Sequence, residues 1–259
     1  MFTKRRLSSS ALTIGLLCVA AQDANAGGMR LVQSTTETRT YVHFKVSGDA
    51  IQRALPAGWI SSPGTGPLQG ANLIVLLVEG LAAANPEGKP VLNRGKFVLW
   101  AVPAKNERNG EAGVMVVGGL TSQPQAAPGA YGVYAPARIA MSKSSRSTGV
   151  DETAVEESWE AASDAGDAVR FSIAYERGLG VRAHIEPHAH AAIRPDFYRV
   201  YKTDQVSDIV HSATDGNRRA AKLEFVAKGP QLARLFDGQE QLVAVTSIPV
   251  YSRDILLPE

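Results

Sequence analysis

The sequence has almost no cysteine, no long apolar run and no excess of charge of one sign. Its single cysteine, Cys18, lies within the first 26 residues. The rest of the chain therefore can form no disulfide, use no thiol nucleophile and bind no metal through sulfur. No apolar run reaches the roughly 20 residues that a membrane-spanning helix needs, so we expect no transmembrane segment. A Gly-rich phosphate loop after a strand and an internal repeat are also missing.

The first residues carry the features of a secretory signal peptide. Lys4-Arg5-Arg6 is a short basic region, an apolar stretch runs from Ala11 to Ala21, and Ala24-Asn25-Ala26 has the small-x-small form of a cleavage site. We predict that Met1–Ala26 is removed on export and that the protein is periplasmic or secreted. Residues 27–259 are expected to form one domain.

Charge excludes one class of partner. The chain has 27 basic and 25 acidic residues, and removal of Lys4, Arg5, Arg6 and Asp23 leaves 24 of each. A neutral chain without a basic run lacks the electrostatic footprint of a nucleic-acid-binding protein. We expect no nucleic-acid partner, and the sequence leaves the oligomeric state open, with a homo-oligomer among the alternatives.

Most of the periodic segments favour β-strands. They alternate polar and apolar residues or form short apolar runs between turn residues. The expected strands are Tyr41–Val46, Ala71–Val78, Lys96–Val102, Gly113–Val117, Ala130–Met141, Ala168–Tyr175, Gly180–Ile185, Tyr198–Lys202, Ser207–Ala213, Ala220–Ala227 and Leu242–Tyr251.

Two segments favour short helices instead. Asp151–Ala162 is rich in Glu and Ala with acids in its first turn, and Pro230–Phe236 has proline at a first helical position. A turn over 176–179 predicts a hairpin between the strands on either side of it. The fold class that follows is mainly β (α+β): an antiparallel, cone- or barrel-like sheet with about two short helices.

The most concentrated polar motif is His184-Ile185-Glu186-Pro187-His188-Ala189-His190. In a continuous strand, His184, Glu186, His188 and His190 would point to one face. Imidazoles and a carboxylate are ligands that zinc and other divalent transition metals prefer. The alternative is a solvent-facing polar strand in which Pro187 breaks the alternation. No cofactor other than such a metal is predicted.

A second segment resembles a known family. Gly129-Ala130-Tyr131-Gly132-Val133-Tyr134-Ala135-Pro136-Ala137-Arg138-Ile139-Ala140 is similar to the motif G-R-E-x-x-G-[FY]-P-K-K-x-A of the acetoacetate decarboxylase superfamily. Leu55-Pro56-Ala57-Gly58 and the C-terminal Asp254–Pro258 add weaker similarity. The resemblance implies a mainly antiparallel, cone-like β-barrel that encloses a small-molecule pocket.

The chain departs from that family at the residues that carry its chemistry. The lysine that forms a Schiff base in the family corresponds to Ala137, its neighbouring lysine to Arg138, and the family's acidic residue to Tyr131. Alanine forms no imine, and arginine stays protonated. An arginine in an apolar cavity can still hold a carboxylate. The predicted ligand-binding residues are therefore Arg138, Tyr134 and Tyr131.

Three functional classes follow from these patterns. The first is an exported decarboxylase-like domain that binds a small organic acid or ketone without Schiff-base lysine chemistry. The second is a metal-dependent periplasmic enzyme that uses the His184–His190 cluster, with Glu186 as a ligand or as the base that activates water. The third is a non-catalytic interaction protein.

Overall fold

The computed structural model describes residues 28–92, 95–123, 131–149 and 152–259. The predicted signal peptide lies outside these residues, as do Gly129, Ala130 and Asp151 of the segments predicted above. The strands are β1 Met29–Lys45, β2 Trp59–Ser61, β3 Leu73–Ala84, β4 Lys96–Asn106, β5 Ala112–Thr121, β6 Tyr134–Ser147, β7 Thr153–Ser163, β8 Ala168–Glu176, β9 Val181–Ile185, β10 His188–Ala191, β11 Arg194–Ser212, β12 Ala220–Lys228 and β13 Gln241–Pro258; the helical elements are α1 Gly48–Ala54 and the 3₁₀ turns η1 Gly66–Leu68 and η2 Leu232–Arg234.

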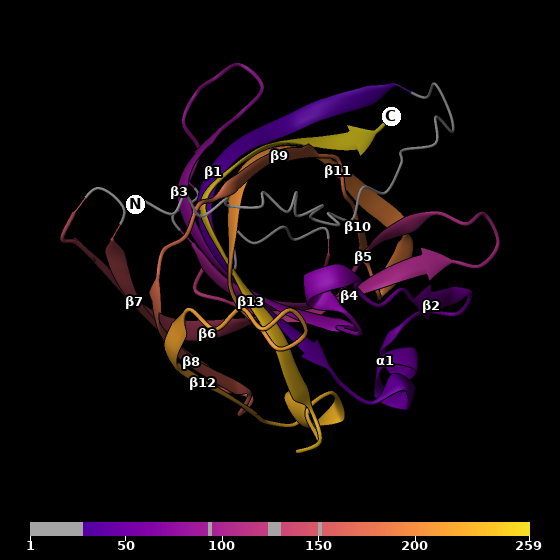
Figure 1. Ribbon diagram of the computed structural model, residues 1–259. Coiled ribbons are helices and arrows are strands. Elements are labelled where there is room, and N and C mark those ends of the chain that lie inside the picture. The colour runs from indigo at the N-terminus through magenta and orange to yellow at the C-terminus, as the bar shows by residue number, and fades with distance from the viewer. Residues whose placement is uncertain (1–27, 93–94, 124–130, 150–151) are drawn as a thin grey trace, which may run out of the picture.

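Seven strands close into a barrel (Figure 1), in the order β5-β10-β11-β13-β1-β3-β4, and β4 pairs with β5 to complete the ring. All but one of these pairings are antiparallel; β10 runs parallel to β5. The predicted mainly β, barrel-like fold is confirmed. Among the described residues, no helix is long and apolar enough to cross a membrane.

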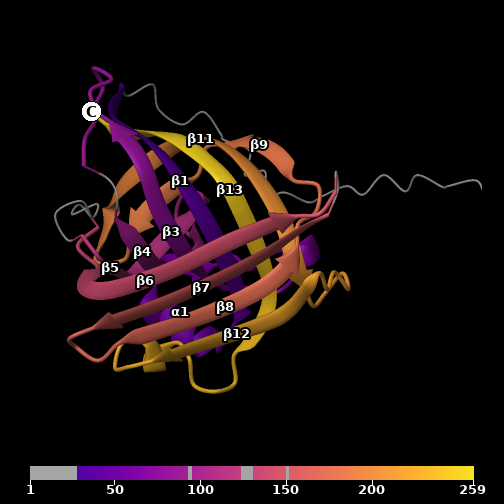
Figure 2. The ribbon, with the colours of Figure 1, turned by 90° about the vertical axis from the view of Figure 1, so that its left-hand side faces the viewer.

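A second layer covers one side of the barrel. Strands β6, β7, β8 and β12 form an antiparallel sheet, and β6 joins the barrel through a short parallel pairing with β5. Figure 2 shows these strands crossing the outside of the steeper barrel strands β1, β3, β11 and β13.

The main core lies between the two layers because alternate residues of a strand face opposite sides of its sheet. Val42 and Phe44 of β1 are fully or almost fully buried on the outer face of the barrel. The Phe44 ring packs 4.6 Å from Phe225 of β12 and 5.2 Å from Phe236, between ring centroids. The opposite face of β1 is left to line the inside of the barrel.

The prediction of a helix over Asp151–Ala162 is wrong. The described part of this segment belongs to β7, in which Val155, Glu157, Trp159 and Ala161 are all buried and the residues between them are not. Ala and Glu are good helix formers, but helix propensity is a weak preference that tertiary context overrides, and in β7 the burial of alternate residues outweighs it. Glu157 is consequently a buried residue that accepts a hydrogen bond from the Trp159 indole at 2.7 Å.

Two other local predictions need correction. No hairpin joins β8 to β9, because β8 pairs with β7 and β12 whereas β9 pairs with β11. The predicted helix Pro230–Phe236 is reduced to the short turn η2. The α-helix in the described residues, α1, was not predicted; Ser47 caps it by accepting a hydrogen bond from the Ala50 amide at 3.5 Å.

Candidate functional site

The barrel encloses a cavity of about 520 Å³, within the range of small-molecule pockets. Strands β1, β3, β4, β5, β11 and β13 supply most of its wall, through side chains that alternate with those of the outer core. The polar and charged residues of the lining are Gln33, Thr35, Glu37, Arg39, Tyr41, Asn85, Tyr131, Tyr134, Arg199, Tyr201, Gln205, Tyr251 and Arg253.

The wall of the cavity is divided by polarity. Strands β3, β4 and β5 contribute only aliphatic and phenyl side chains. Strands β1, β11 and β13 contribute all of the charged side chains and most of the hydroxyl-bearing ones. The apolar members on the first side are Ile74, Leu76, Val78, Phe97, Leu99, Val114 and Val116. A molecule inside the barrel therefore meets a charged side and an apolar side.

A buried ion-pair network occupies the charged side. Arg39 donates through Nε to Glu37 Oε2 at 2.7 Å, and Arg253 donates through Nη2 to Glu37 Oε1 at 3.0 Å. Thr35 donates to the same Oε1 at 3.0 Å. Burial alone would raise the pKa of Glu37, but Arg253 and Arg39 more than offset it and lower that pKa. Glu37 is therefore ionised and shared by two guanidinium groups.

Tyrosine rings also contact the guanidinium groups of Arg39 and Arg253. The Arg39 guanidinium carbon lies 3.4 Å from the centre of the Tyr251 ring, and that of Arg253 lies 4.1 Å from the centre of Tyr201. Such contacts stabilise a cation without neutralising its charge. Arg39 also donates to the Tyr41 hydroxyl at 2.8 Å. These contacts fix both arginines in position. The single carboxylate of Glu37 balances only one of their two positive charges.

A third arginine in the lining, Arg199, has fewer partners. Its guanidinium carbon lies 5.2 Å from the centre of the Tyr131 ring, and it forms no salt bridge within the described residues. Its Nε is buried without a hydrogen-bond partner there, and so is Oε1 of Gln205 on the same strand, β11. Buried polar atoms without partners are uncommon in folded proteins and mark places where a ligand or water completes the network.

The structure places Tyr131 and Tyr134 in the cavity wall. The Tyr131 hydroxyl is hydrogen-bonded to that of Tyr201. Burial, reinforced by the neighbouring tyrosine, raises the pKa of Tyr131 and also that of Tyr134. Both hydroxyls therefore stay protonated near neutral pH and can donate a hydrogen bond.

Arg138 lies elsewhere. It is exposed on β6, opposite Ala162 of β7, and is not among the residues that line the cavity. Ala137, at the position of the family's Schiff-base lysine, packs against the core between the two layers. The arginines that do line the cavity come from β1, β11 and β13. The sequence contains a signal for Arg39. Polar residues occupy alternate positions of β1 at Glu37, Arg39 and Tyr41, although both faces of this strand are buried.

The four predicted metal ligands do not follow one strand: His184 belongs to β9, His188 and His190 belong to β10, and Glu186 lies between the two strands. His184 is exposed and lies 3.8 Å from Asp204, and Glu186 is exposed. His188 and His190 instead meet Glu111, which sequence reasoning did not select. Nothing local marks Glu111, since it reaches the histidines only through the parallel pairing of β10 with β5.

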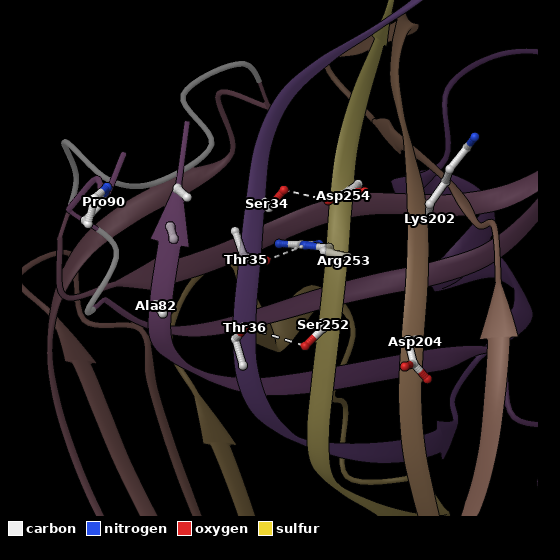
Figure 3. Close-up of a pocket in the computed structure, with 12 residues that line it drawn as sticks. Ser34, Thr35, Thr36, Ala82, Pro90, Lys202, Asp204, Ser252, Arg253 and Asp254 are labelled. Carbon is white, nitrogen blue, oxygen red and sulfur yellow. Dashed lines mark hydrogen bonds between the residues drawn. The ribbon is translucent and has the colours of Figure 1, made fainter. Parts of the chain in front are cut away.

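A second hollow lies on the outside of the barrel (Figure 3). Small polar side chains of β1 and β13 border it and pair with each other: Ser34 donates to Asp254 at 2.6 Å, and Thr36 meets Ser252 at 3.5 Å. These polar groups are satisfied within the described structure and the hollow is open. We therefore place the candidate site in the barrel interior.

The seven-stranded barrel with a sheet packed across it and a cavity inside is an acetoacetate decarboxylase-like fold, as the sequence resemblance predicted. Similar solved structures are "Enduracididine biosynthesis enzyme MppR complexed with pyruvate" (TM-score 0.51, 13% identity, 87% of this chain and 88% of that chain) and an acetoacetate decarboxylase-like enzyme from Sphingomonas wittichii RW1 (TM-score 0.52, 11% identity, 88% and 92%). No protein-family model and no curated protein matches the sequence. The likeness establishes the fold, and the activity has to be argued from the residues of this chain.

Proposed function

We propose that the barrel binds a small carboxylic acid that carries an apolar tail. The observation that supports this is the division of the cavity wall. A carboxylate fits the side that holds Arg39, Arg199 and Arg253, and a hydrocarbon or phenyl group fits the side formed by residues such as Leu76 and Phe97. The similar MppR structure is described as a complex with pyruvate, itself a small carboxylate.

The balance of charge in the cavity favours an anion. Three arginines line it against one carboxylate, Glu37, which leaves a formal charge of three minus one, or +2. Charges in protein interiors are normally paired, because taking an unpaired ion out of water costs several kcal/mol. A bound carboxylate would reduce the excess and accept hydrogen bonds that arginine donates in a fixed, fork-like geometry.

Arg199 is the residue to which we assign the carboxylate. Arg39 and Arg253 already share Glu37, whereas Arg199 has no carboxylate partner in the described residues. Tyr131 lies beside it with a protonated hydroxyl, and Gln205 adds an acceptor for a hydroxyl group or bound water. Together these groups would fix the polar end of the ligand.

The test of this assignment is Arg199→Gln, with Arg138→Gln as the matched control on the exposed face of β6. Loss of a charge-assisted hydrogen bond costs about 1.5–3 kcal/mol, so we expect Arg199→Gln to weaken binding of 3-phenylpropanoate about 10- to 100-fold. Arg138→Gln should bind like the wild type. Titration calorimetry measures both; equal affinities in wild type and Arg199→Gln would refute the assignment.

We further propose that the site does not form an imine with its ligand. An imine needs a lysine amine beside a ketone. None of the described lining residues is a lysine, and the lysine position of the family is Ala137. Incubation with pyruvate or acetoacetate followed by borohydride should leave the protein mass unchanged. A covalent adduct on a single lysine would show that Schiff-base chemistry survives here.

The predicted signal peptide supports export, so we propose that the acid is bound in the periplasm or outside the cell. The N-terminal residue of the protein recovered from that compartment tests this, with Gly27 expected. Export and acid binding are separate proposals, and either can fail without the other.

A further inference from the structure

A histidine-carboxylate cluster lies on the outer side of the barrel wall. His188 and His190 alternate with Ala189, which lines the cavity, so the two imidazoles point to the opposite face of β10. Glu111 immediately precedes β5, the parallel neighbour of β10, and lies against both rings. This cluster is independent of the acid-binding site proposed above.

The distances within the cluster suit one metal ion. Glu111 Oε1 lies 2.9 Å from His188 Nδ1 and 3.4 Å from His190 Nε2, and one ligand atom from each residue lies within 4.8 Å of the others. Ligand atoms 2.0–2.1 Å from a tetrahedral zinc ion are about 3.3 Å apart. Only small side-chain movements separate the observed arrangement from that geometry.

The hydrogen bond that His190 makes through Nδ1 determines the tautomer of its neutral ring. Nδ1 lies 3.1 Å from the carbonyl oxygen of Pro195 and donates to it, which leaves the lone pair on Nε2. Nε2 is buried, has no hydrogen-bond partner among the described residues, and faces the carboxylate of Glu111. Two acceptors that face each other at 3.4 Å require a cation or a proton between them.

Neighbouring aromatic residues pack against the two histidine rings. Tyr198 stacks on His188 and on His190, each with ring centroids 5.3 Å apart, and Trp59 packs 4.6 Å from His190. A Cβ atom at Gly113 would lie 2.8 Å from the His188 carbonyl oxygen and 3.3 Å from His190 Nε2, so glycine allows β5 to lie this close to the two histidines. The His188 and Glu111 side chains are 34% and 26% exposed, which allows an ion to enter.

We propose that Glu111, His188 and His190 bind one divalent transition-metal ion, of the zinc type, on the outer face of the barrel. Two imidazoles and one carboxylate are a known ligand set for zinc and leave a fourth position for water. The ion would replace the proton that His188 shares with Glu111. Glu111 takes the place that the sequence pattern assigned to His184 and Glu186.

The test is calorimetric titration of zinc into the metal-stripped protein, purified without a histidine tag. We expect one equivalent of zinc to bind. Glu111→Gln and His188→Gln should each weaken binding more than about 100-fold, beyond the 10- to 100-fold loss typical of an outer partner. His184→Gln, which changes an exposed histidine outside the cluster, should bind like the wild type. Circular dichroism confirms that each variant is folded.

Three outcomes would overturn the proposal: no zinc binding by the wild type, unchanged affinity in Glu111→Gln, or loss of binding in His184→Gln. Loss of binding in His184→Gln would show that His184 is a metal ligand, as the alternation in the sequence motif predicted. Binding of 3-phenylpropanoate should survive metal removal, so failure of the metal site and failure of the acid site are distinguishable.

Discussion

Replacing Glu37 with glutamine is expected to lower the free energy of unfolding by about 3–5 kcal/mol, the usual effect of removing one partner of a buried ion pair. Glutamine keeps the size of the side chain and removes its charge. Arg39 and Arg253 would then both lie in the barrel without a carboxylate, and burial makes an unpaired guanidinium costly. Urea denaturation of the two proteins at neutral pH measures the difference.

The matched control is Glu79→Gln, the same substitution in a pair at the protein surface. Glu79 lies 3.9 Å from Lys96, and both side chains are more than a quarter exposed. Solvent-exposed pairs contribute about 0–1 kcal/mol, so this variant should be close to wild type. If Glu37→Gln were no less stable than Glu79→Gln, the arginines would not depend on Glu37 for their charge balance. The cavity would then not hold the unbalanced positive charge to which we assign the acid.

The second large effect is a loss of stability in mild acid caused by His43. This histidine of β1 is almost fully buried, and burial lowers its pKa to about 4. In the unfolded chain its pKa is near 6.5, so between these two values the unfolded state binds a proton that the folded state does not. Stability therefore falls as the pH drops below 6.5, and this contribution amounts to roughly 3 kcal/mol at pH 4.

The His43→Gln variant isolates this contribution from all other titrating groups. Glutamine retains a hydrogen-bonding group near Thr246 Oγ1, which lies 3.3 Å from His43 Nε2. Denaturation curves at pH 7 and pH 4 should show a smaller loss of stability in the variant than in the wild type. Equal losses in both proteins would mean that burial does not lower the pKa of His43 in the folded protein.

The sequence predicted the architecture because alternation of polar and apolar residues reports burial directly. It failed at β7 because helix propensity and strand alternation disagree there. A helix over Asp151–Ala162 would leave its glutamates on a solvated face, yet Glu157 is buried between the two layers. Only the pairing of β7 with β6 and β8 decides between the two interpretations.

The candidate site was partly accessible to sequence reasoning. Tyr131 and Tyr134 were selected through the family motif, and both line the cavity. Arg199 and Arg253 were not selected, because the order in which strands pair around a barrel brings distant segments together. Glu111 was missed for the same reason: it lies 77 residues before His188 in the chain.

The most direct measurement of the central claim compares 3-phenylpropanoate with its primary amide, 3-phenylpropanamide, in titration calorimetry on the wild-type protein. The two compounds have nearly the same size and apolar tail and differ in charge. The excess positive charge around Arg199 predicts that the acid binds at least about tenfold more tightly, since a charge-assisted hydrogen bond contributes 1.5–3 kcal/mol. Equal binding of the two compounds, or tighter binding of the amide, would contradict an anion-binding barrel.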